Sequence, residues 1–276
     1  ILKEAIYVKE VLNENRHFFK QILKLSKSEL IKTYKGAALG PAWAVIKPVI
    51  TIFVYWFAFA IGLRGGKPIS YNGVTVDFFP FLMVGTIPWF FMSDAILNGA
   101  GCFRKNRQYI TKMRFPVSTI PTFTLLADMY TNMFLVFLMY IVLLFLGHGP
   151  SVFNLQYFIY MPLMFLFFWM LSFITAPLSV ISKDFYNLVK AIMTALFWMS
   201  GAVYDAHGLT SELLRRIINA MPITFFINGF RNTFLFNKPF FETRYEFFCF
   251  FCWFVVIAAL GMYTYKKLRK TLPDVL

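Results

Sequence analysis

Three ionisable side chains, Lys47, Asp94 and Asp128, lie inside or beside strongly apolar stretches of the sequence. An isolated charge near the centre of a bilayer costs on the order of 3 kcal/mol, so we expect each to face a polar cavity, a charged partner or an interface. Two alternatives stay open: the side chains could reach the lipid headgroups, or they could pair and hold helices together. A proton relay is disfavoured because no ladder of acids continues through the other apolar stretches.

No nucleotide-binding or catalytic motif accompanies these charges. The segment "IGLRGGKP" has Ile61 where a phosphate-binding loop needs glycine and Pro68 where it needs a hydroxyl. No H-E-x-x-H is present, and Ser93 beside Asp94 is a poor catalytic pair because adjacent helical residues point in different directions. We therefore expect no catalytic residues, and no ATP hydrolysis by this chain alone.

The cysteines and histidines do not predict a metal site. Cys249 and Cys252 are spaced C-F-F-C in an apolar run, and we expect these two and Cys102 to face lipid or to pack against other helices. The three histidines are widely separated in the sequence. No metal ion and no cofactor are expected in this chain.

The composition indicates an integral membrane protein. Of 276 residues 59% are hydrophobic and 20% aromatic, which is more apolar surface than one soluble core can hide. A helix needs about 20 residues to cross the hydrocarbon core. Segments of that kind lie at 43–63, 79–100, 118–146, 157–182, 188–204 and 246–265. The sequence predicts an all-α polytopic fold with six spans and, before the last one, interfacial or re-entrant helices broken at Pro222 and Gly229.

The 27 Lys and Arg residues, against 13 Asp and Glu, indicate the orientation. Most of them fall on one side of the membrane if both termini are cytoplasmic, which is the side that cations prefer. The expected domains are a cytoplasmic segment (1–40), a transmembrane domain (41–265) and a cytoplasmic tail (266–276). No cleavable signal peptide is expected at the start, and no nucleic-acid partner, because topology accounts for the excess of cations.

Residues 16–35 predict an amphipathic helix that lies along the membrane surface, in contact with membrane lipid. Apolar residues recur there at helical spacing and lysines occupy another face. Glycines and a proline then break this helix and turn the chain into the first span. We interpret these residues and the start of that span as a gate hinge: Gly36, Gly40, Pro41, Trp43 and Pro48.

Large aromatic rings cluster in the expected spans. Interfacial belts and helix packing are the default explanations. Aromatic faces also stack on the C–H faces of sugar rings, and repeated weak contacts would let a long glycan slide. The candidates for such a path are Tyr55, Trp56, Trp89, Phe90, Phe91, Phe197 and Trp198.

Several segments, in this order along the chain, resemble those of one family. They are "ELIKTYKGAALGPAWAVIKPVI", "FLMVGTIPWFF", "ITKMRFPVSTIPT", "LSVISKDFYNLVKAIM" and "GFRNTFL". Over nearly the whole chain they resemble the permease subunit of ABC-2-type polysaccharide exporters, a group that includes O-antigen and wall teichoic acid exporters. "YWFAFAIGLRGGKP" and "PWFFMSDAILNG" are most similar to the teichoic acid branch.

The resemblance implies a homodimer that works with two separate cytoplasmic ABC ATPases, which hold ATP and Mg, in a bacterial cell membrane. Such a complex exports an undecaprenyl-diphosphate-linked glycopolymer, here expected to be teichoic acid. The family's L-G-x-x-W element corresponds to Leu39, Gly40 and Trp43. Its ATPase-coupling elements correspond to Arg104, Lys105, Arg107, Lys112 and Arg114, and to the turn Lys183, Asp184 and Phe185. At Lys183 the family often has arginine, whose bidentate geometry lysine lacks.

Lys32, Lys35 and Lys47 are expected to receive the substrate diphosphate, because ammonium groups pair strongly with phosphates. Other functions stay open: an O-antigen or capsular polysaccharide permease, or an ABC-2 permease for a drug or a lipid. A membrane enzyme acting on lipid-linked sugars is a further alternative, for which Asp77, Asp94 and Asp205 are the nearby acids.

Overall fold

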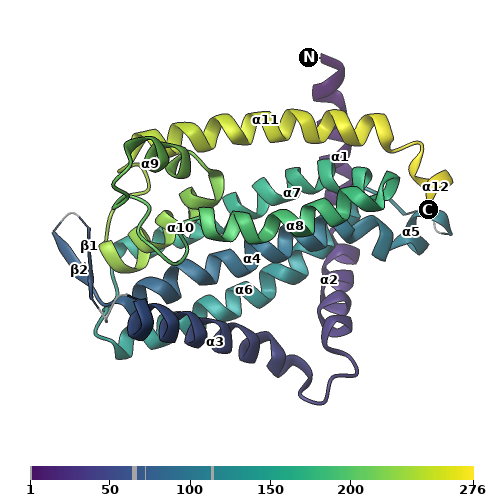
Figure 1. Cartoon of the computed structure of the whole chain (residues 1–276). Coiled ribbons are helices and arrows are strands. Elements are labelled where there is room, and N and C mark those ends of the chain that lie inside the picture. Colours follow the sequence, from purple (N-terminus) through teal and green to yellow (C-terminus); the bar gives the residue numbers. More distant parts are fainter. Residues whose placement is uncertain (1, 64–66, 72, 113–114) are drawn as a thin grey trace.

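A computed structural model describes residues 2–63, 67–71, 73–112 and 115–276. Arg114 and part of the "IGLRGGKP" segment lie outside these ranges. In the described residues, long helices run roughly side by side and one short hairpin protrudes at one end (Figure 1). The predicted all-α membrane fold is confirmed.

Five helical segments of the described residues are long and apolar enough to cross a membrane. The first runs from Gly40 to Gly62 and consists of η1 (Gly40–Ala42), α3 (Trp43–Trp56) and all but the last residue of the π-helical segment η2 (Phe57–Leu63). The others are α4 (Phe78–Lys105), α6 (Thr119–Phe145), α7 (Tyr157–Ile181) preceded by η3 (Val152–Gln156), and α11 (Arg244–Leu268). Each overlaps a predicted span.

The predicted count of six spans is not confirmed, because α8 (Lys183–Met199) has only 17 residues. At 1.5 Å per residue it is about 25 Å long, short of the hydrocarbon thickness. It nevertheless packs on α4 and α7 and leads the chain back along the bundle (Figure 1). A single extended residue, Ser182, joins it to α7, and the Ser182 hydroxyl accepts a hydrogen bond from the Phe185 amide at 3.3 Å. The predicted turn Lys183–Phe185 is therefore the first turn of α8.

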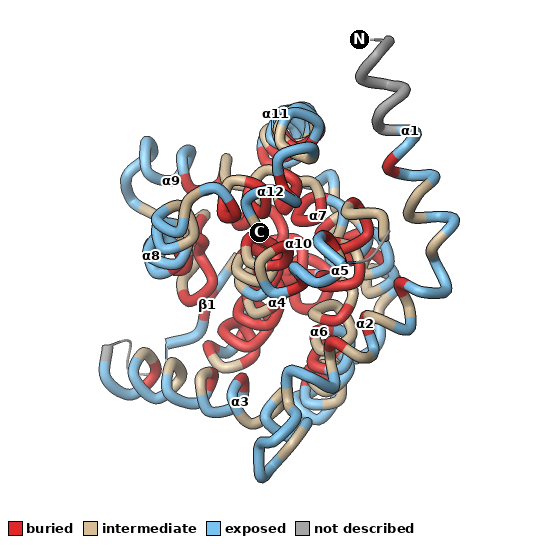
Figure 2. The backbone as a smooth tube through the Cα atoms, turned by 90° about the vertical axis from the view of Figure 1, so that its right-hand side faces the viewer, coloured by how far each residue is buried: buried red, intermediate tan, exposed pale blue. Residues whose placement is uncertain are grey.

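The core of the protein lies along α4 and α7 (Figure 2). Phenylalanine rings from both helices, among them Phe81, Phe103, Phe168 and Phe173, are almost fully buried. The outer faces of α3, α8 and α11 carry exposed apolar side chains instead, such as Phe53, Leu188 and Phe248. Exposed apolar surface on this scale suits contact with lipid or with another apolar protein surface.

Two helices, α1 (Leu2–His17) and α2 (Phe19–Tyr34), cross the bundle near the end that carries α5 (Arg107–Thr111), α12 (Leu272–Val275) and the C-terminus (Figure 1). A helix predicted over residues 16–35 is thus present as α2. Within it Ile22, Ser26 and Glu29 are buried in the bundle, whereas Phe19 is 56% exposed. A polar face turned inward implies polar partners inside the bundle.

The opposite end carries the hairpin and the short helices (Figure 1). Strands β1 (Ile69–Tyr71) and β2 (Val74–Val76) pair antiparallel. Before α11 come α9 (Glu212–Asn219), α10 (Pro222–Arg231) and the π-helical η4 (Asn232–Phe236). Pro222 begins α10, as predicted, but Gly229 does not break it. A Cβ at Gly229 would overlap the Tyr160 ring, so this glycine lets α10 approach α7 closely.

Candidate functional site

A cavity of about 480 Å³ lies between α2, α3, α4 and α6, near the end of the bundle that α2 crosses. Lys47 of α3, Asp94 of α4 and Asp128 of α6 all line it. All three side chains thus lie at a cavity, which is one of the surroundings expected for them from the sequence.

Helical spacing on α4 and α6 builds the polar wall of the cavity. Asp94 and Asn98 are four residues apart on α4, and Thr124 and Asp128 are four apart on α6, so each pair shares one helix face. Asn98 donates a hydrogen bond to Asp128 Oδ1 at 2.9 Å. Asp128 Oδ2 and Thr124 Oγ1 are enclosed and have no hydrogen-bond partner among the described residues. The described protein therefore leaves two polar groups beside the cavity without a hydrogen-bond partner.

An ion pair connects α2 with the end of α4 at the edge of the cavity. Lys105 Nζ lies 2.6 Å from Glu29 Oε1, and Lys32 Nζ lies 3.9 Å from Glu29 Oε2. The Glu29 side chain is 5% exposed, and the Lys105 side chain is 51% exposed. Glu29 was not predicted from the sequence. The feature that could have indicated it is that Glu29 is the one acidic residue of the lysine-rich helix α2, on the same face as Ile22 and Ser26.

Aromatic rings form the other part of the cavity lining: Tyr34, Trp43, Trp89 and Phe90. Burial raises the pKa of the Tyr34 hydroxyl above its usual value, and the carboxylates of Asp94 and Asp128 raise it further. This hydroxyl is therefore neutral at pH 7 and can both donate and accept a hydrogen bond.

The remaining aromatic candidates, Tyr55, Trp56, Phe91, Phe197 and Trp198, are not among the residues that line the cavity. Phe197 contacts Tyr55, Trp89 and Trp198, with ring centroids 5.2, 5.3 and 5.4 Å away. Trp56 packs edge-on against Phe79. Phe91 is 2% exposed and packs against Phe168, so within the protein it is a core residue. Trp198 is 49% exposed.

The predicted hinge residues lie where the chain turns from α2 into α3. Gly36 has φ 87° and Gly40 has φ 48°, a region that favours glycine. Pro41 is in η1, and Trp43 begins α3 and lines the cavity. Pro48 lies inside α3, where its missing amide leaves the Ala44 carbonyl without that intrahelical donor.

The predicted phosphate-binding and coupling cations are spread over the same end of the bundle. Arg104 donates to the Val180 carbonyl at 3.3 Å and ties α4 to α7. Phe185 is half-buried. The other described members of both sets, apart from Lys105 in its ion pair, are exposed: Lys32, Lys35, Lys47, Arg107, Lys112, Lys183 and Asp184. Only Lys47 and Lys105 among these cations line the cavity.

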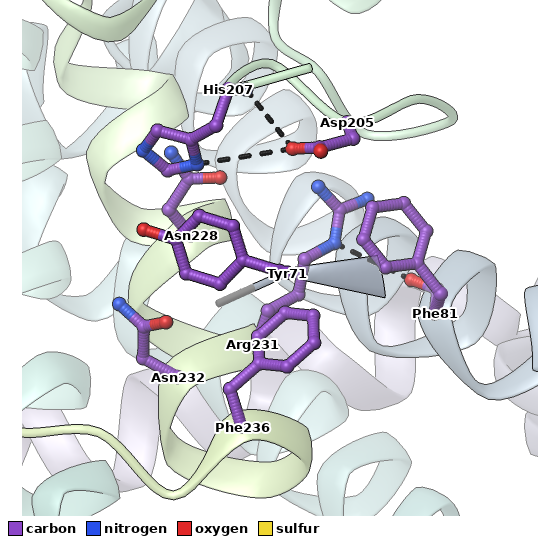
Figure 3. A pocket seen from close by; sticks show the side chains of 8 residues that line it. All are labelled: Tyr71, Phe81, Asp205, His207, Asn228, Arg231, Asn232 and Phe236. Atoms are coloured by element: carbon purple, nitrogen blue, oxygen red, sulfur yellow. Dashed lines mark hydrogen bonds and ion pairs between the residues drawn. The ribbon is translucent and has the colours of Figure 1, made fainter. Parts of the chain in front are cut away.

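A second polar cluster lies at the opposite end, beside the hairpin (Figure 3). His207 Nε2 lies 2.5 Å from Glu246 Oε1, and the His207 amide donates to Asp205 Oδ1 at 3.0 Å. The Tyr71 ring stacks on the His207 ring with centroids 4.8 Å apart. The enclosed space is about 10 Å³, room for about one water molecule. This cluster therefore holds structure together and is too small for a substrate.

Arg231 fixes the same end of the bundle, and the sequence analysis missed this role. Its guanidinium is buried and donates to the carbonyls of Gly201, Ala202 and Tyr204 at 2.9, 2.7 and 3.4 Å. It also donates to the Phe81 carbonyl at 3.4 Å. One side chain thus joins α10, the residues after α8 and the start of α4.

No group of three His, Cys, Asp or Glu residues that could hold a metal ion occurs within the described ranges. In the same residues Cys102 is buried, Cys249 is partly buried and Cys252 is exposed, all as free thiols. The site is therefore built from hydroxyls, carboxylates, ammonium groups and rings.

The fold and the cavity define a polytopic α-helical membrane protein with a cavity of mixed polar and aromatic lining, bounded on one side by α2. The chain belongs to the ABC-2 type transporter family, whose model matches residues 20–235. This is a family of transporter subunits, not of enzymes.

Three similar proteins are O-antigen export system permease proteins. One from Myxococcus xanthus is 25% identical over 72% of this chain and 74% of its own length. Two from Klebsiella pneumoniae are 23% and 22% identical, covering 94% and 79% of this chain and 96% and 82% of their own lengths. Members of the teichoic acid branch are not among these three.

Proposed function

We propose that the chain is the permease subunit of an ATP-driven exporter that moves a polysaccharide of the O-antigen type across the bacterial inner membrane. The cargo is proposed to be lipid-linked, through undecaprenyl diphosphate, and to travel from the cytoplasmic to the outer face. One observation carries the proposal: a relative described as an O-antigen export permease aligns with 94% of the chain and 96% of its own length. Because the alignment covers nearly the whole chain, it includes α2, the helices that line the cavity, and the short helices α9 and α10.

The relatives support O-antigen rather than teichoic acid, the cargo expected from the sequence segments. All three are described as O-antigen permeases. The cavity agrees with either cargo, because hydroxyls, carboxylates and rings are general carbohydrate-binding groups. The experiment below therefore uses both polymers.

A separate ATPase and a second copy of the chain complete the proposed transporter. The sequence has no phosphate-binding loop, so the ATP must be hydrolysed elsewhere. Arg107, Lys112 and Lys183 are exposed at the end of the bundle that carries the C-terminus, which we place in the cytoplasm as the ATPase-docking face. The exposed apolar faces of α3 and α8 are proposed to meet the second copy.

The test is purification of the tagged chain from its native membranes, followed by reconstitution in liposomes. We expect an ABC ATPase to co-purify in equal copy number and its ATP hydrolysis to rise when lipid-linked O-antigen is added. Lipid-linked teichoic acid should give a smaller rise. Absence of a co-purifying ATPase, or transport by the isolated chain, would refute the proposal.

Lys32, Lys35 and Lys47 are proposed to receive the diphosphate of the carrier lipid. All three are exposed; Lys32 and Lys35 do not line the cavity, whereas Lys47 does. The proposed diphosphate site is therefore the exposed edge of the cavity, beside Lys47, and not its interior. Replacing all three with Gln should lower export and glycolipid-stimulated ATPase activity, with assembly of the complex unchanged. The matched control replaces Lys266, Lys267 and Lys270 with Gln. Equal loss in both triple variants would contradict a specific role.

A further inference from the structure

We propose that the cavity between α2, α3, α4 and α6 binds one uncharged sugar ring of the exported glycan and excludes the carrier diphosphate. The inference rests on the proposed function, because it takes a polysaccharide as cargo. It adds a binding site and the chemical class of its ligand. The site is built from the polar wall of α4 and α6 and from the rings that face it.

The charges in the cavity argue against a phosphate in its interior. Three carboxylates, Glu29, Asp94 and Asp128, and two ammonium groups, Lys47 and Lys105, line it. Lys105 is occupied by Glu29 at 2.6 Å, which leaves Lys47 as the one other ammonium group among the described residues that line the cavity. A diphosphate carries more than one negative charge, which a single ammonium group does not balance, and the unbalanced charge costs more free energy as the local dielectric falls. A neutral sugar brings no charge into the cavity and therefore does not incur this electrostatic cost.

The unused hydrogen-bonding groups suit a ligand rich in hydroxyls. Asp128 Oδ2 has no partner among the described residues, and neither does Thr124 Oγ1, although Thr124 is only 2% exposed. A buried polar atom without a partner costs free energy, so a bound group that satisfies both atoms is favoured. A sugar hydroxyl can donate to the carboxylate and also bond the threonine hydroxyl, which both donates and accepts.

The rings and the size of the cavity complete the match. Trp43 lines the cavity from the start of α3 and is 42% exposed, and Phe90 lines the same space from α4. The C–H face of a pyranose stacks on such rings, as the aromatic-lined pockets of small-molecule sites show in general. A volume of about 480 Å³ falls within the range of about 300–1,000 Å³ typical of small-molecule pockets.

The test is saturation-transfer difference NMR on the purified full chain in lipid nanodiscs. The probes are the methyl glycosides of glucose, galactose, mannose and N-acetylglucosamine, with inorganic pyrophosphate as an anionic competitor. We expect transfer to the ring protons of at least one glycoside and no displacement by pyrophosphate. Asp128→Asn should weaken binding about tenfold, because the amide keeps a single acceptor oxygen, which Asn98 already occupies.

Thr124→Val separates ligand binding from folding. Its hydroxyl has no partner in the described protein, so its loss should leave the melting temperature unchanged or higher while glycoside binding falls about threefold. Asp274→Asn, which alters an exposed carboxylate near the C-terminus, is the matched control and should bind as the unmodified chain does.

The inference is overturned if no glycoside in the panel shows transfer, if Asp128→Asn and Thr124→Val bind as tightly as the control, or if pyrophosphate displaces the sugar. Its failure is distinguishable from failure of the proposed function. If the complex with its ATPase exports lipid-linked polymer but no glycoside binds in this cavity, only the sugar site is refuted. If the reconstituted complex does not export polymer, the proposed function is refuted, whatever the NMR result.

Discussion

Replacing Lys105 with Gln should loosen α2 from the bundle, because it leaves the Glu29 carboxylate buried without its nearest cation. Breaking a fully buried ion pair costs about 3–5 kcal/mol, whereas an exposed pair contributes about 0.2–1 kcal/mol. Here one partner is 5% exposed and the other 51%, which places the expected cost between these limits, at about 2 kcal/mol. Lys32, at 3.9 Å, compensates only in part because half of its side chain is in solvent.

The assay is hydrogen–deuterium exchange of the peptides that cover α2, measured on the protein in nanodiscs. A local cost of about 2 kcal/mol corresponds to roughly thirtyfold faster exchange of those amides, while α7 should keep its protection. Glu29→Gln added to Lys105→Gln should restore most of the protection, since the stranded charge is then removed. Lys112→Gln, a nearby exposed lysine, is the control. Unchanged exchange in Lys105→Gln, or a double variant as loose as the single one, would refute this reasoning.

Two further substitutions test contacts at the opposite end. Glu246→Ala should lower the stability by about 1–3 kcal/mol, because the half-buried His207 ring and the buried Asn228 amide lose a hydrogen-bond partner. A melting temperature like that of Glu242→Ala, which alters an exposed carboxylate, would contradict this. Gly229→Ala should also destabilise the protein by about 1–3 kcal/mol, because the new methyl group overlaps the Tyr160 ring. The control is Gly62→Ala, where a Cβ would have no neighbour within 4 Å, and equal thermal stability of the two variants would argue against the close packing of α10 on α7.

The lengths of the apolar stretches in the sequence predicted the long helices, and the glycines after residue 35 predicted where α2 ends. Gly36 and Gly40 have the positive φ angles for which glycine is suited. The same reasoning failed at α8. The apolar run continues to residue 204, but the helix ends at Met199 and Gly201 adopts φ 74°. Its start was missed because Ser182, an ordinary residue in a polar turn, acts as the N-cap.

Part of the cavity could also be predicted, because Lys47, Asp94 and Asp128 are conspicuous in apolar surroundings. Glu29 and Thr124 could not. A glutamate in a lysine-rich surface helix and a threonine in a span are ordinary residues until the packing of α2, α4 and α6 brings them to one space. Arg231 was hidden for a similar reason: its carbonyl partners lie far away in the sequence.

The one-residue joint at Ser182 limits how α7 and α8 can separate. Consecutive Cα atoms are 3.8 Å apart, so the last turn of α7 and the first turn of α8 are tethered within a residue's reach. The far end of α8, more than a dozen residues away, has no such tether to α7. Any widening between these helices would therefore pivot at Ser182, and the hydrogen bonds from Arg231 to the Gly201 and Ala202 carbonyls, just after α8, oppose it.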